Sequence, residues 1–332
     1  MRISTIVPAY NRAELIGATL RSLLEQTRPP DELIVVDDGS TDGTADIARN
    51  FGVTVIRQPN AGAGAARNAG FAKSTGEIVH FMDSDDLASP NTYRIQAGLI
   101  EAGSDIVYGP WQRTRFEGNM LRPEPVVVQQ GPMRGTCSFD KMVLTGRWLT
   151  VFQPCLFRRA TLEAAGPYRT DLKTAEDIEL LYRLMRQTTR ISHVEDTLVL
   201  YRVHPENQLS EGDGKQRAID FARLWITFQQ YIDARDDLGW SDRAAVRSGK
   251  LKAAREALSH APDIAAALVS DCSSADRLFA KVRALGDRVS AKLRFHTAGH
   301  RYKPEFAVGR LTERQREQIT LMGYAIADKP AD

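Results

Sequence analysis

Three carboxylates within four residues form the densest group of reactive side chains in this sequence. Asp83, Asp85 and Asp86 surround Ser84 and directly follow the apolar run at residues 78–82. Like charges this close repel one another unless a cation or hydrogen bonds offset them. A divalent ion such as Mg²⁺ or Mn²⁺ takes about six oxygen ligands, and a site with few carboxylates leaves positions for substrate phosphates. The group is therefore a candidate metal and diphosphate site, and a solvated polar turn is the structural alternative.

An acidic pair and an arginine offer contacts to a nucleotide. Asp37 and Asp38 follow the apolar run at residues 32–36. A carboxylate at this place can accept hydrogen bonds from a base N–H or a ribose hydroxyl, and capping of the next helix is the alternative role. Arg67 can place its guanidinium over a base or against a phosphate. Its alternative is an exposed arginine on a helix.

Two further groups lie later in the chain. Glu176 and Asp177 open a predicted helix, where the helix dipole favours a carboxylate. Their functional interpretation is a general base that removes the proton of an acceptor hydroxyl as it attacks. Arg202 and His204 have the same parity at the end of a predicted strand, so they point to one face. Together they suit a diphosphate and its metal, although a histidine at the surface needs no such role.

The elements that must position these groups form a doubly wound α/β pattern in the first ninety residues. Strands are predicted at residues 3–8, 32–36, 53–57 and 78–82, with helices at 12–26, from 41 or 42 to 50, and within 60–76. Ligands of open α/β sheets bind beyond the carboxyl ends of the strands. The polar residues at 10–11, 37–38 and 83–86 are all predicted to lie there.

The remainder of the chain divides into an irregular part and a helical part. Prolines interrupt residues 91–165, where we expect loops and a few strands, such as 105–108 and 126–129. A helix at 174–187 and a strand at 197–203 follow. Beyond Glu211 the strand patterns vanish, so we expect residues 1–210 to form a catalytic domain and residues 211–332 a mainly α-helical C-terminal region.

Composition narrows the classes of partner. The 332 residues carry 44 Lys and Arg against 42 Asp and Glu, so the net charge of +2 provides no electrostatic basis for nucleic-acid binding. The three cysteines lie far apart without C-x-x-C spacing, which favours a reducing cytoplasm over a zinc site or a disulfide framework. No run approaches the roughly 18 apolar residues of a membrane-spanning helix. We expect a cytoplasmic protein that at most lies on the inner face of a membrane.

Five motifs in order carry a family resemblance: IVPAYNR, VVDDGSTDGT, NAGAGAARNAGFAKSTGEIVHFMDSDD, AED and YRVH. This order resembles the family 2 inverting glycosyltransferases with a GT-A fold, over roughly residues 1–210. The resemblance implies a mixed sheet flanked by helices. It also implies transfer of a sugar from a nucleotide-diphosphate donor, with inversion at the anomeric carbon and a divalent cation, Mn²⁺ or Mg²⁺, on the diphosphate.

The resemblance also implies roles for individual residues of the donor site. The set that would bind the donor, favoured as UDP-linked, consists of Pro8, Ala9 and Tyr10 in the nucleotide pocket, Asp38 at the base, Arg67 as a support, Asp83 with Ser84 near the ribose, and Arg202 at the diphosphate. Asp85 and His204 would bind the metal. Asp177 would be the general base, and Glu176 would orient the acceptor or the sugar.

The sequence departs from the processive members of this family. Their Q-x-x-R-W motif has no counterpart, because Leu144, Thr145 and Gly146 precede Arg147–Trp148. We therefore predict a single-addition enzyme of bacterial-type polysaccharide or glycoconjugate synthesis, acting on a glycan or lipid-linked acceptor. Alternatives are a non-catalytic nucleotide-sugar binding protein and a nucleotidyltransferase on a related fold, although IVPAYNR lacks the Gly-rich basic loop of the latter.

A basic segment distinguishes the C-terminal region. Residues 273–310 contain nine Lys or Arg and three Asp or Glu, and apolar residues recur at helical spacing from Leu278 to Leu293. Such a helix can lie on an anionic membrane surface. Packing of the same stripe against its own domain is one alternative, and contact with a second copy in a homodimer is another.

Overall fold

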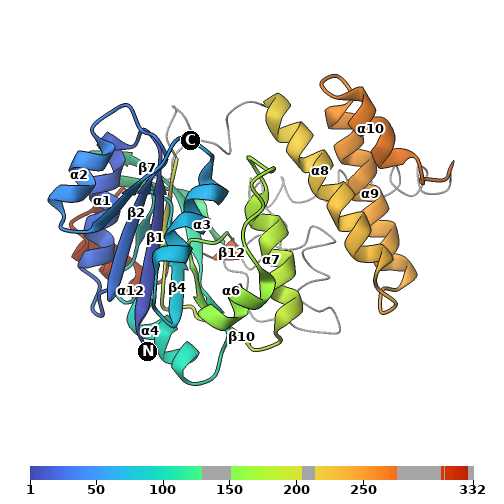
Figure 1. Ribbon diagram of the computed structural model, residues 1–332. Helices are drawn as coiled ribbons and strands as arrows, with labels where there is room; N and C mark the ends of the chain where they lie inside the picture. Colours follow the sequence, from blue (N-terminus) through green and yellow to red (C-terminus); the bar gives the residue numbers. More distant parts are fainter. Residues whose placement is uncertain (129–150, 204–213, 275–307, 310, 328–332) are drawn as a thin grey trace.

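The computed structural model describes residues 1–128, 151–203, 214–274, 308–309 and 311–327, which form two β-sheets and their surrounding helices (Figure 1). The first sheet has the strand order β10-β6-β9-β4-β1-β2-β3. Its strands are β1 (Ile3–Ala9), β2 (Glu32–Asp37), β3 (Thr54–Arg57), β4 (Ile78–Phe81), β6 (Ile106–Tyr108), β9 (Cys155–Arg158) and β10 (Ile191–His193). Only β9 runs antiparallel to its neighbours among these described strands, so the sheet is mixed.

The second sheet is built from strands that alternate along the chain with the later strands of the first sheet. Its strand order is β12-β8-β7-β11-β5, and β13 pairs with β8 in addition to these strands. The strands are β5 (Leu87–Ala88), β7 (Trp111–Glu117), β8 (Met120–Val128), β11 (Val199–Val203), β12 (Val308–Gly309) and β13 (Ala325–Ile326). Residues 82–86 connect β4 of the first sheet to β5 of the second, so the acidic group lies at their junction.

Helices cover both faces of the first sheet because its strands are apolar on both sides. Ile3 and Val7 of β1 pack with Leu20 of α1 (Ala13–Leu24) and Tyr93 of α4 (Thr92–Glu101), whereas Ile6 faces the opposite core. That opposite face is covered by α3 (Ala63–Lys73), α6 (Arg159–Ala165) and α7 (Glu176–Gln187). The remaining helix of this part is α2 (Thr44–Asn50), which packs against α1.

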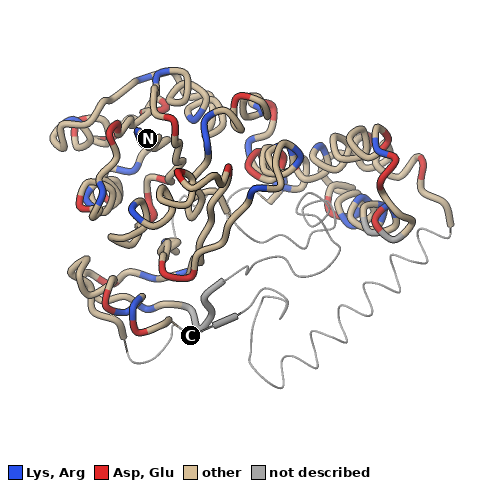
Figure 2. The backbone as a smooth tube through the Cα atoms, turned by 90° about the horizontal axis from the view of Figure 1, so that it is seen from below, with Lys and Arg blue, Asp and Glu red and all other residues tan. Residues whose placement is uncertain are grey.

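Three consecutive helices belong to the C-terminal region, and the first of them lies next to α7. They are α8 (Gly214–Asp233), α9 (Trp240–Ala257) and α10 (Pro262–Val269). Small residues let them approach closely, since Ala222, Ala254 and Ala265 share one buried cluster. Figure 2 shows Lys and Arg interspersed with Asp and Glu along these helices. Leu224 and Phe228 of α8 also belong to the main core of the first sheet.

The predicted fold class is confirmed: a mixed α/β sheet flanked by helices, followed by a helical C-terminal region. The predicted strands and helices of the first ninety residues occur within about three residues of their expected bounds. The division at residue 210 stays a prediction. The basic stripe, His204 and Arg147–Trp148 lie outside the described residues.

Two expectations about strands were wrong. The prolines of residues 91–165 predict loops with a few strands, among them one at 126–129. Instead, β7 and β8 form a long antiparallel pair, of which only residues 126–128 fall within a predicted strand. The register of this pair shifts between Gln112 and Thr114, where the facing residue changes from Val127 to Pro123. The C-terminal region also contains two strands: β12 and β13 pair with β8, and α12 (Glu313–Leu321) packs beside them. Strands of two residues are too short to show an alternating pattern, so pairing with β8 creates them.

None of the helices in the described ranges combines the length and the apolar character that crossing a bilayer requires.

The close approach of α3 to β1 makes Gly70 a test of this packing. A Cβ at Gly70 would overlap Ile6 Cγ2 and lie 3.1 Å from Val36 Cγ2. We expect Gly70→Ala to lower the free energy of unfolding by about 1–3 kcal/mol, the usual cost of overpacking. Urea denaturation followed by circular dichroism measures this change.

Gly98→Ala is the matched control, because Gly98 also lies within a helix but has open space around its Cβ position. It should raise the free energy of unfolding by about 0.5–1 kcal/mol through helix propensity. Equal effects of the two substitutions would contradict the packing argument.

Candidate functional site

The acidic group at the junction of the two sheets forms a compact set of oxygen donors. Carboxylate oxygens of Asp83, Asp85 and Asp86 lie within 4.8 Å of one another. Asp83 and Asp85 are partly exposed, whereas Ser84 and Asp86 are buried. Arg12 Nε lies 3.3 Å from Asp85 Oδ2 and offsets part of the charge. The group is open to solvent on the side of Asp83 and Asp85.

Asp86 is a functional candidate that the sequence-based choice of metal ligands omitted. Its Oδ1 accepts a hydrogen bond of 2.8 Å from the backbone N–H of Arg202, while its buried Oδ2 has no hydrogen-bond partner among the residues that the structure describes. Burial, and then the charges of Asp85 and Asp83, raise the pKa of Asp86 well above its usual range. A buried carboxylate oxygen that receives no hydrogen bond is suited to bind a cation. The carboxylate oxygens of this group therefore suit Mg²⁺ or Mn²⁺.

Arg67 joins this acidic group to the helix that carries the candidate base. From α3, its Nη2 donates to Asp83 Oδ1 at 2.7 Å and its Nη1 donates to Glu176 Oε1 at 2.8 Å. The residue is only 6% exposed, which excludes the alternative of an exposed helical arginine. Burial opposes its charge, but Asp83, Tyr168 and Glu176 together raise the pKa of Arg67. Two groups 93 residues apart in sequence, Asp83 and Glu176, therefore share one guanidinium.

The first residues of α7 present two carboxylates of different exposure. Glu176 is buried, and Asp177 is partly exposed with its Oδ1 accepting a 2.8 Å hydrogen bond from the Ile178 N–H. Burial raises the pKa of both carboxyl groups, and Arg67 offsets part of this effect. Ala175, directly before them, has φ 67° and ψ 11°, a left-handed conformation that non-glycine residues seldom adopt. Asp177 is thus the one of the pair with access to a substrate.

Asp38 shapes the loop that precedes α3. Its Oδ1 accepts hydrogen bonds from Gln58 Nε2 at 2.7 Å and the Ala61 N–H at 3.0 Å, and its Oδ2 accepts one from the Gly62 N–H at 2.8 Å. Asp37 accepts from the Ser40 N–H, so neither carboxylate caps α2. Asp38 can accept a further hydrogen bond, because a carboxylate has about four acceptor positions.

The end of β1 lies beside the end of β2, as the sequence predicted. Ala9 pairs with Asp37 in the register of the two strands. Pro8 and Ala9 are buried in β1, whereas Tyr10, beyond the strand, is 46% exposed. Asn11, with φ 51°, accepts a 2.9 Å hydrogen bond from the Thr41 N–H. This edge therefore presents an aromatic side chain next to the Asp38 loop.

Arg202 approaches the acidic group from β11, and the segment of residues 311–327 lies close to its side chain. Its guanidinium carbon lies 4.0 Å from the ring centroid of Phe116, and Tyr324 packs edge-on against the same ring at 5.5 Å. Burial lowers the pKa of Arg202, and the charges of Tyr324, Asp86 and Asp85 counteract this. Sequence analysis gave no sign of Tyr324, because its partners are more than 100 residues away.

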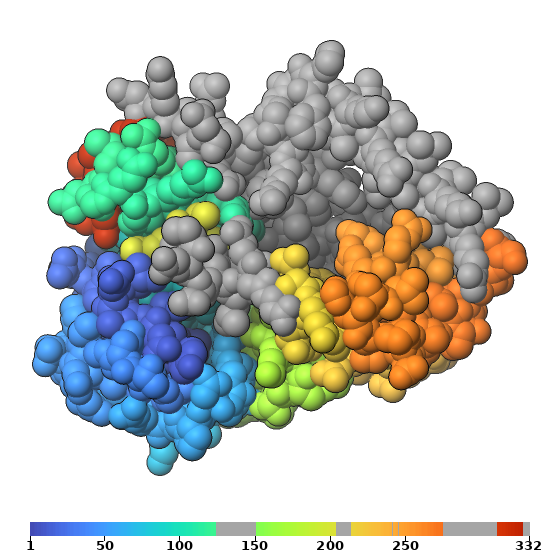
Figure 3. All heavy atoms as spheres, turned by 90° about the horizontal axis from the view of Figure 1, so that it is seen from above, coloured from blue at the N-terminus to red at the C-terminus, as the bar shows by residue number. Residues whose placement is uncertain are grey.

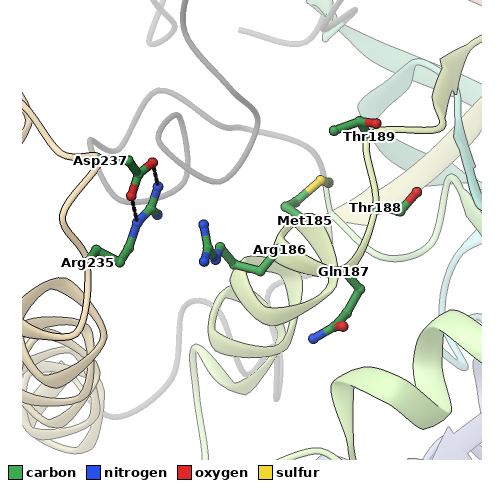
Figure 4. A pocket seen from close by; sticks show the side chains of 7 residues that line it. All are labelled: Met185, Arg186, Gln187, Thr188, Thr189, Arg235 and Asp237. Carbon is green, nitrogen blue, oxygen red and sulfur yellow. Dashed lines mark hydrogen bonds and ion pairs between the residues drawn. The ribbon is translucent and has the colours of Figure 1, made fainter.

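A cavity of about 370 Å³ lies at the other end of α7 (Figure 4). It is lined by residues 185–189 and by Arg235, whose guanidinium makes hydrogen bonds of 2.9 and 2.6 Å to Asp237. A helix of 12 residues such as α7 is about 18 Å long, so this cavity is remote from Asp177. It is separate from the candidate site.

The shared guanidinium makes stability depend on Arg67. Arg67→Met keeps a side chain of similar length but leaves Glu176 without its charged partner in a buried place. We expect the free energy of unfolding to fall by about 3–5 kcal/mol, the usual effect of removing one partner of a buried ion pair. Urea denaturation of the metal-free protein measures it.

Arg49→Met is the control, since Arg49 pairs with Asp46 at the surface, where side chains are 53% and 82% exposed. Exposed pairs contribute about 0–1 kcal/mol. If both substitutions had the same small effect, the proposed dependence on Arg67 would be wrong.

Comparison with known proteins identifies relatives over the part of the chain that carries the site. Residues 4–159 match the protein-family model described as Glycosyl transferase family 2. The chain is 38% identical over 212 residues to the uncharacterized glycosyltransferase YibD of Escherichia coli (strain K12), covering 61% of this chain and 62% of YibD. It is 29% identical over 257 residues to the uncharacterized glycosyltransferase alr2836 of Nostoc sp., covering 73% and 78%. The match thus spans less than two thirds of YibD.

Two solved structures share the fold over most of the chain. TarS residues 1–349 from S. aureus, in complex with UDP-GlcNAc, gives a TM-score of 0.56 at 22% identity and covers 88% of this chain and 81% of that one. The mannosyltransferase PcManGT from Pyrobaculum calidifontis, in complex with GDP-Man and Mn²⁺, gives a TM-score of 0.52 at 20% identity, covering 97% and 84%. These similarities confirm the GT-A-type fold.

Proposed function

This chain belongs to glycosyl transferase family 2 through residues 4–159, and we propose that it transfers one sugar from a nucleotide-diphosphate donor to an acceptor hydroxyl, with inversion. The observation that carries the proposal is the ion-pair link through Arg67. It joins Asp83 of the acidic group to Glu176, the neighbour of the candidate base Asp177. A metal-binding group and a base on opposite sides of one small region are what such a transfer requires.

The donor is expected to lie along the carboxyl ends of β1, β2 and β4. Tyr10, Pro8 and Ala9 would line the pocket for the base, and Asp38 would accept a hydrogen bond from it. Asp83 and Ser84 would approach the ribose. We favour a UDP-linked donor; the structurally similar proteins were solved with UDP-GlcNAc in one case and GDP-Man in the other, so the base must be measured.

The acidic group is expected to hold a divalent cation. Asp85 is the proposed principal ligand, and the orphaned oxygen of buried Asp86 supports a contribution from that residue. His204 is a further proposed ligand that lies outside the described residues. A bound Mn²⁺ or Mg²⁺ stabilises the negative charge of a departing diphosphate. Arg202 adds a positive charge close to the same place.

Asp177 is the proposed general base. Its carboxylate would take the proton of the acceptor hydroxyl while the hydroxyl oxygen forms the new bond to the anomeric carbon and the bond to the diphosphate breaks. Arg67 favours the ionised form of Asp177, because it lowers a pKa that burial raises. Glu176, held by Arg67, would orient the acceptor or the sugar. A role in polysaccharide or glycoconjugate synthesis, with a glycan or lipid-linked acceptor, belongs to this proposal.

A screen of nucleotide sugars tests the donor and the metal together. Thermal unfolding is followed with UDP-, GDP-, dTDP- and CMP-sugars, each with and without Mn²⁺. A ligand at 100 times its Kd stabilises the folded state by about 2.7 kcal/mol, so a true donor raises the Tm clearly. We expect the largest shift with a UDP-sugar and Mn²⁺. No shift with any of these donors would contradict the proposed function.

Asp85→Ala separates the metal ligand from the donor pocket in the same screen. The variant should lose the Mn²⁺-dependent part of the shift, because it lacks the principal ligand. Asp46→Ala, which changes an exposed carboxylate on α2, should keep it. A metal-dependent shift that survives in Asp85→Ala would refute the choice of ligand.

Asp177→Asn tests the base. We expect transfer to fall by at least about 10²-fold while donor affinity is kept, because a general base acts on the acceptor. In the parent enzyme the ionised base is lost as the pH falls through the raised pKa of Asp177. As the pH is lowered, the rate of transfer should therefore begin to fall at a pH above the usual pKa range of aspartate.

Initial rates and donor titrations measure both quantities, with Asp196→Asn at the surface as the control. Full activity of Asp177→Asn would remove this residue from the mechanism. Donor binding without transfer in the parent, across the acceptors tested, would favour the alternative of a nucleotide-sugar binding protein.

A further inference from the structure

A buried carboxylate on α8 holds the loop that leads into the candidate base. Asp220 Oδ2 accepts hydrogen bonds from the Lys173 N–H at 3.1 Å, the Thr174 N–H at 3.0 Å and the Thr174 hydroxyl at 3.2 Å. Asp220 is fully buried. Three donors of one short loop therefore converge on a single oxygen, two residues before Glu176.

The loop needs such a restraint because of its backbone. Ala175, between the held Thr174 and Glu176, is one of two non-glycine residues with positive φ among the residues described, the other being Asn11. A conformation of this kind persists only where the surroundings enforce it. On the helix side, the Glu179 N–H donates to the Ala175 carbonyl at 3.2 Å. On the loop side, Asp220 supplies the restraint.

Asp220 is itself well anchored. Gln216 Nε2 donates to its Oδ1 at 3.0 Å, and an Arg223 nitrogen lies 3.7 Å from the same oxygen. Farther along α8, the Tyr231 hydroxyl donates to Glu179 Oε1 of α7 at 2.6 Å. Figure 3 shows α8, in yellow, between the green α6 and α7 region and the orange α9 and α10.

The core between the two helices is apolar and continuous. Leu224 and Phe228 of α8 belong to the same buried cluster as Leu180 and Leu184 of α7. Arg169 Nη1, in the loop before α7, also donates to the Thr227 hydroxyl of α8 at 2.6 Å. Helix α8 thus packs both against α7 and against the loop that precedes Glu176 and Asp177.

We propose that Asp220 is a positioning residue for the transfer reaction. By holding residues 173–175, it fixes the start of α7 and therefore the direction in which the Asp177 side chain points. The inference rests on the proposed function for its catalytic part. It makes α8, which follows the family-matched residues 4–159, a working component of the site. Asp220 touches no reacting atom in this account and acts only through the loop.

Three variants and a control test this role. Asp220→Ala removes the acceptor, Asp220→Asn keeps an oxygen but no charge, and Thr174→Val removes one of the three donors. Asp233→Asn is matched, since Asp233 lies on α8 and accepts from Gln229 four residues earlier, but is exposed and far along the helix. Each is compared by kcat, by donor KM and by hydrogen exchange of the backbone amides at 173–178.

We expect Asp220→Ala to lower kcat by about 10²-fold, since a misplacement of about 1 Å of a catalytic group has this effect. Asp220→Asn and Thr174→Val should lose less, donor KM should stay at the parent value, and Asp233→Asn should match the parent. Exchange at 173–178 should accelerate in the order of the kcat losses. A merely structural role would instead change donor KM and exchange throughout the first sheet.

Three results would overturn the proposal. They are parental exchange at 173–178 in Asp220→Asn and Thr174→Val, an unchanged kcat despite faster exchange, and a loss of donor binding that parallels the loss of kcat. If Asp220→Ala does not fold, the two milder variants decide. A parent enzyme that transfers no sugar would refute the proposed function. Its exchange data would then still decide whether Asp220 holds the loop.

Discussion

The candidate site depends on one buried positive charge. Arg67 is the side chain that contacts both Asp83 and Glu176, and it lies close enough to Asp177 to lower its pKa. Five carboxylates, at positions 83, 85, 86, 176 and 177, gather in this part of the molecule, and burial makes the charges of Asp86, Glu176 and Asp177 costly. The guanidinium of Arg67 offsets part of this cost for Glu176 and Asp177, and it ties the start of α7 to Asp83.

Backbone strain occurs at the same place as this concentration of charge. Asn11 and Ala175, the two non-glycine residues with left-handed backbone in the described ranges, lie beside the nucleotide edge and before the candidate base. Asn11 is tied to the loop after β2, and Ala175 is tied to α8 through its neighbour Thr174. In both cases hydrogen bonds from another element hold the unusual backbone, which is the arrangement expected where side-chain direction matters for function.

Segments beyond the family-matched residues complete the site from two sides. The helix α8 supports the start of α7, and the returning segment 311–327 packs Tyr324 against Phe116, beneath the guanidinium of Arg202. The C-terminal region is therefore part of the framework that orients the candidate residues. A site built from a sheet edge needs such support, because loops beyond strand ends have few backbone hydrogen bonds of their own.

The sequence alone determined strands β1, β2, β3, β4 and β6 of the first sheet, the order of the motifs and most of the candidate residues, because these follow from periodicity and from neighbours within a few positions. Strands β9 and β10 of the same sheet were not predicted. Tertiary structure decided what lies far apart in the chain: the sharing of Arg67 by Asp83 and Glu176, the role of Asp86 beside Arg202, the two-residue strands on β8 and the hold of Asp220 on residues 173–175. Contacts across about a hundred residues leave no local pattern. They arise only when the apolar faces of sheet and helices pack and force buried polar groups to find partners.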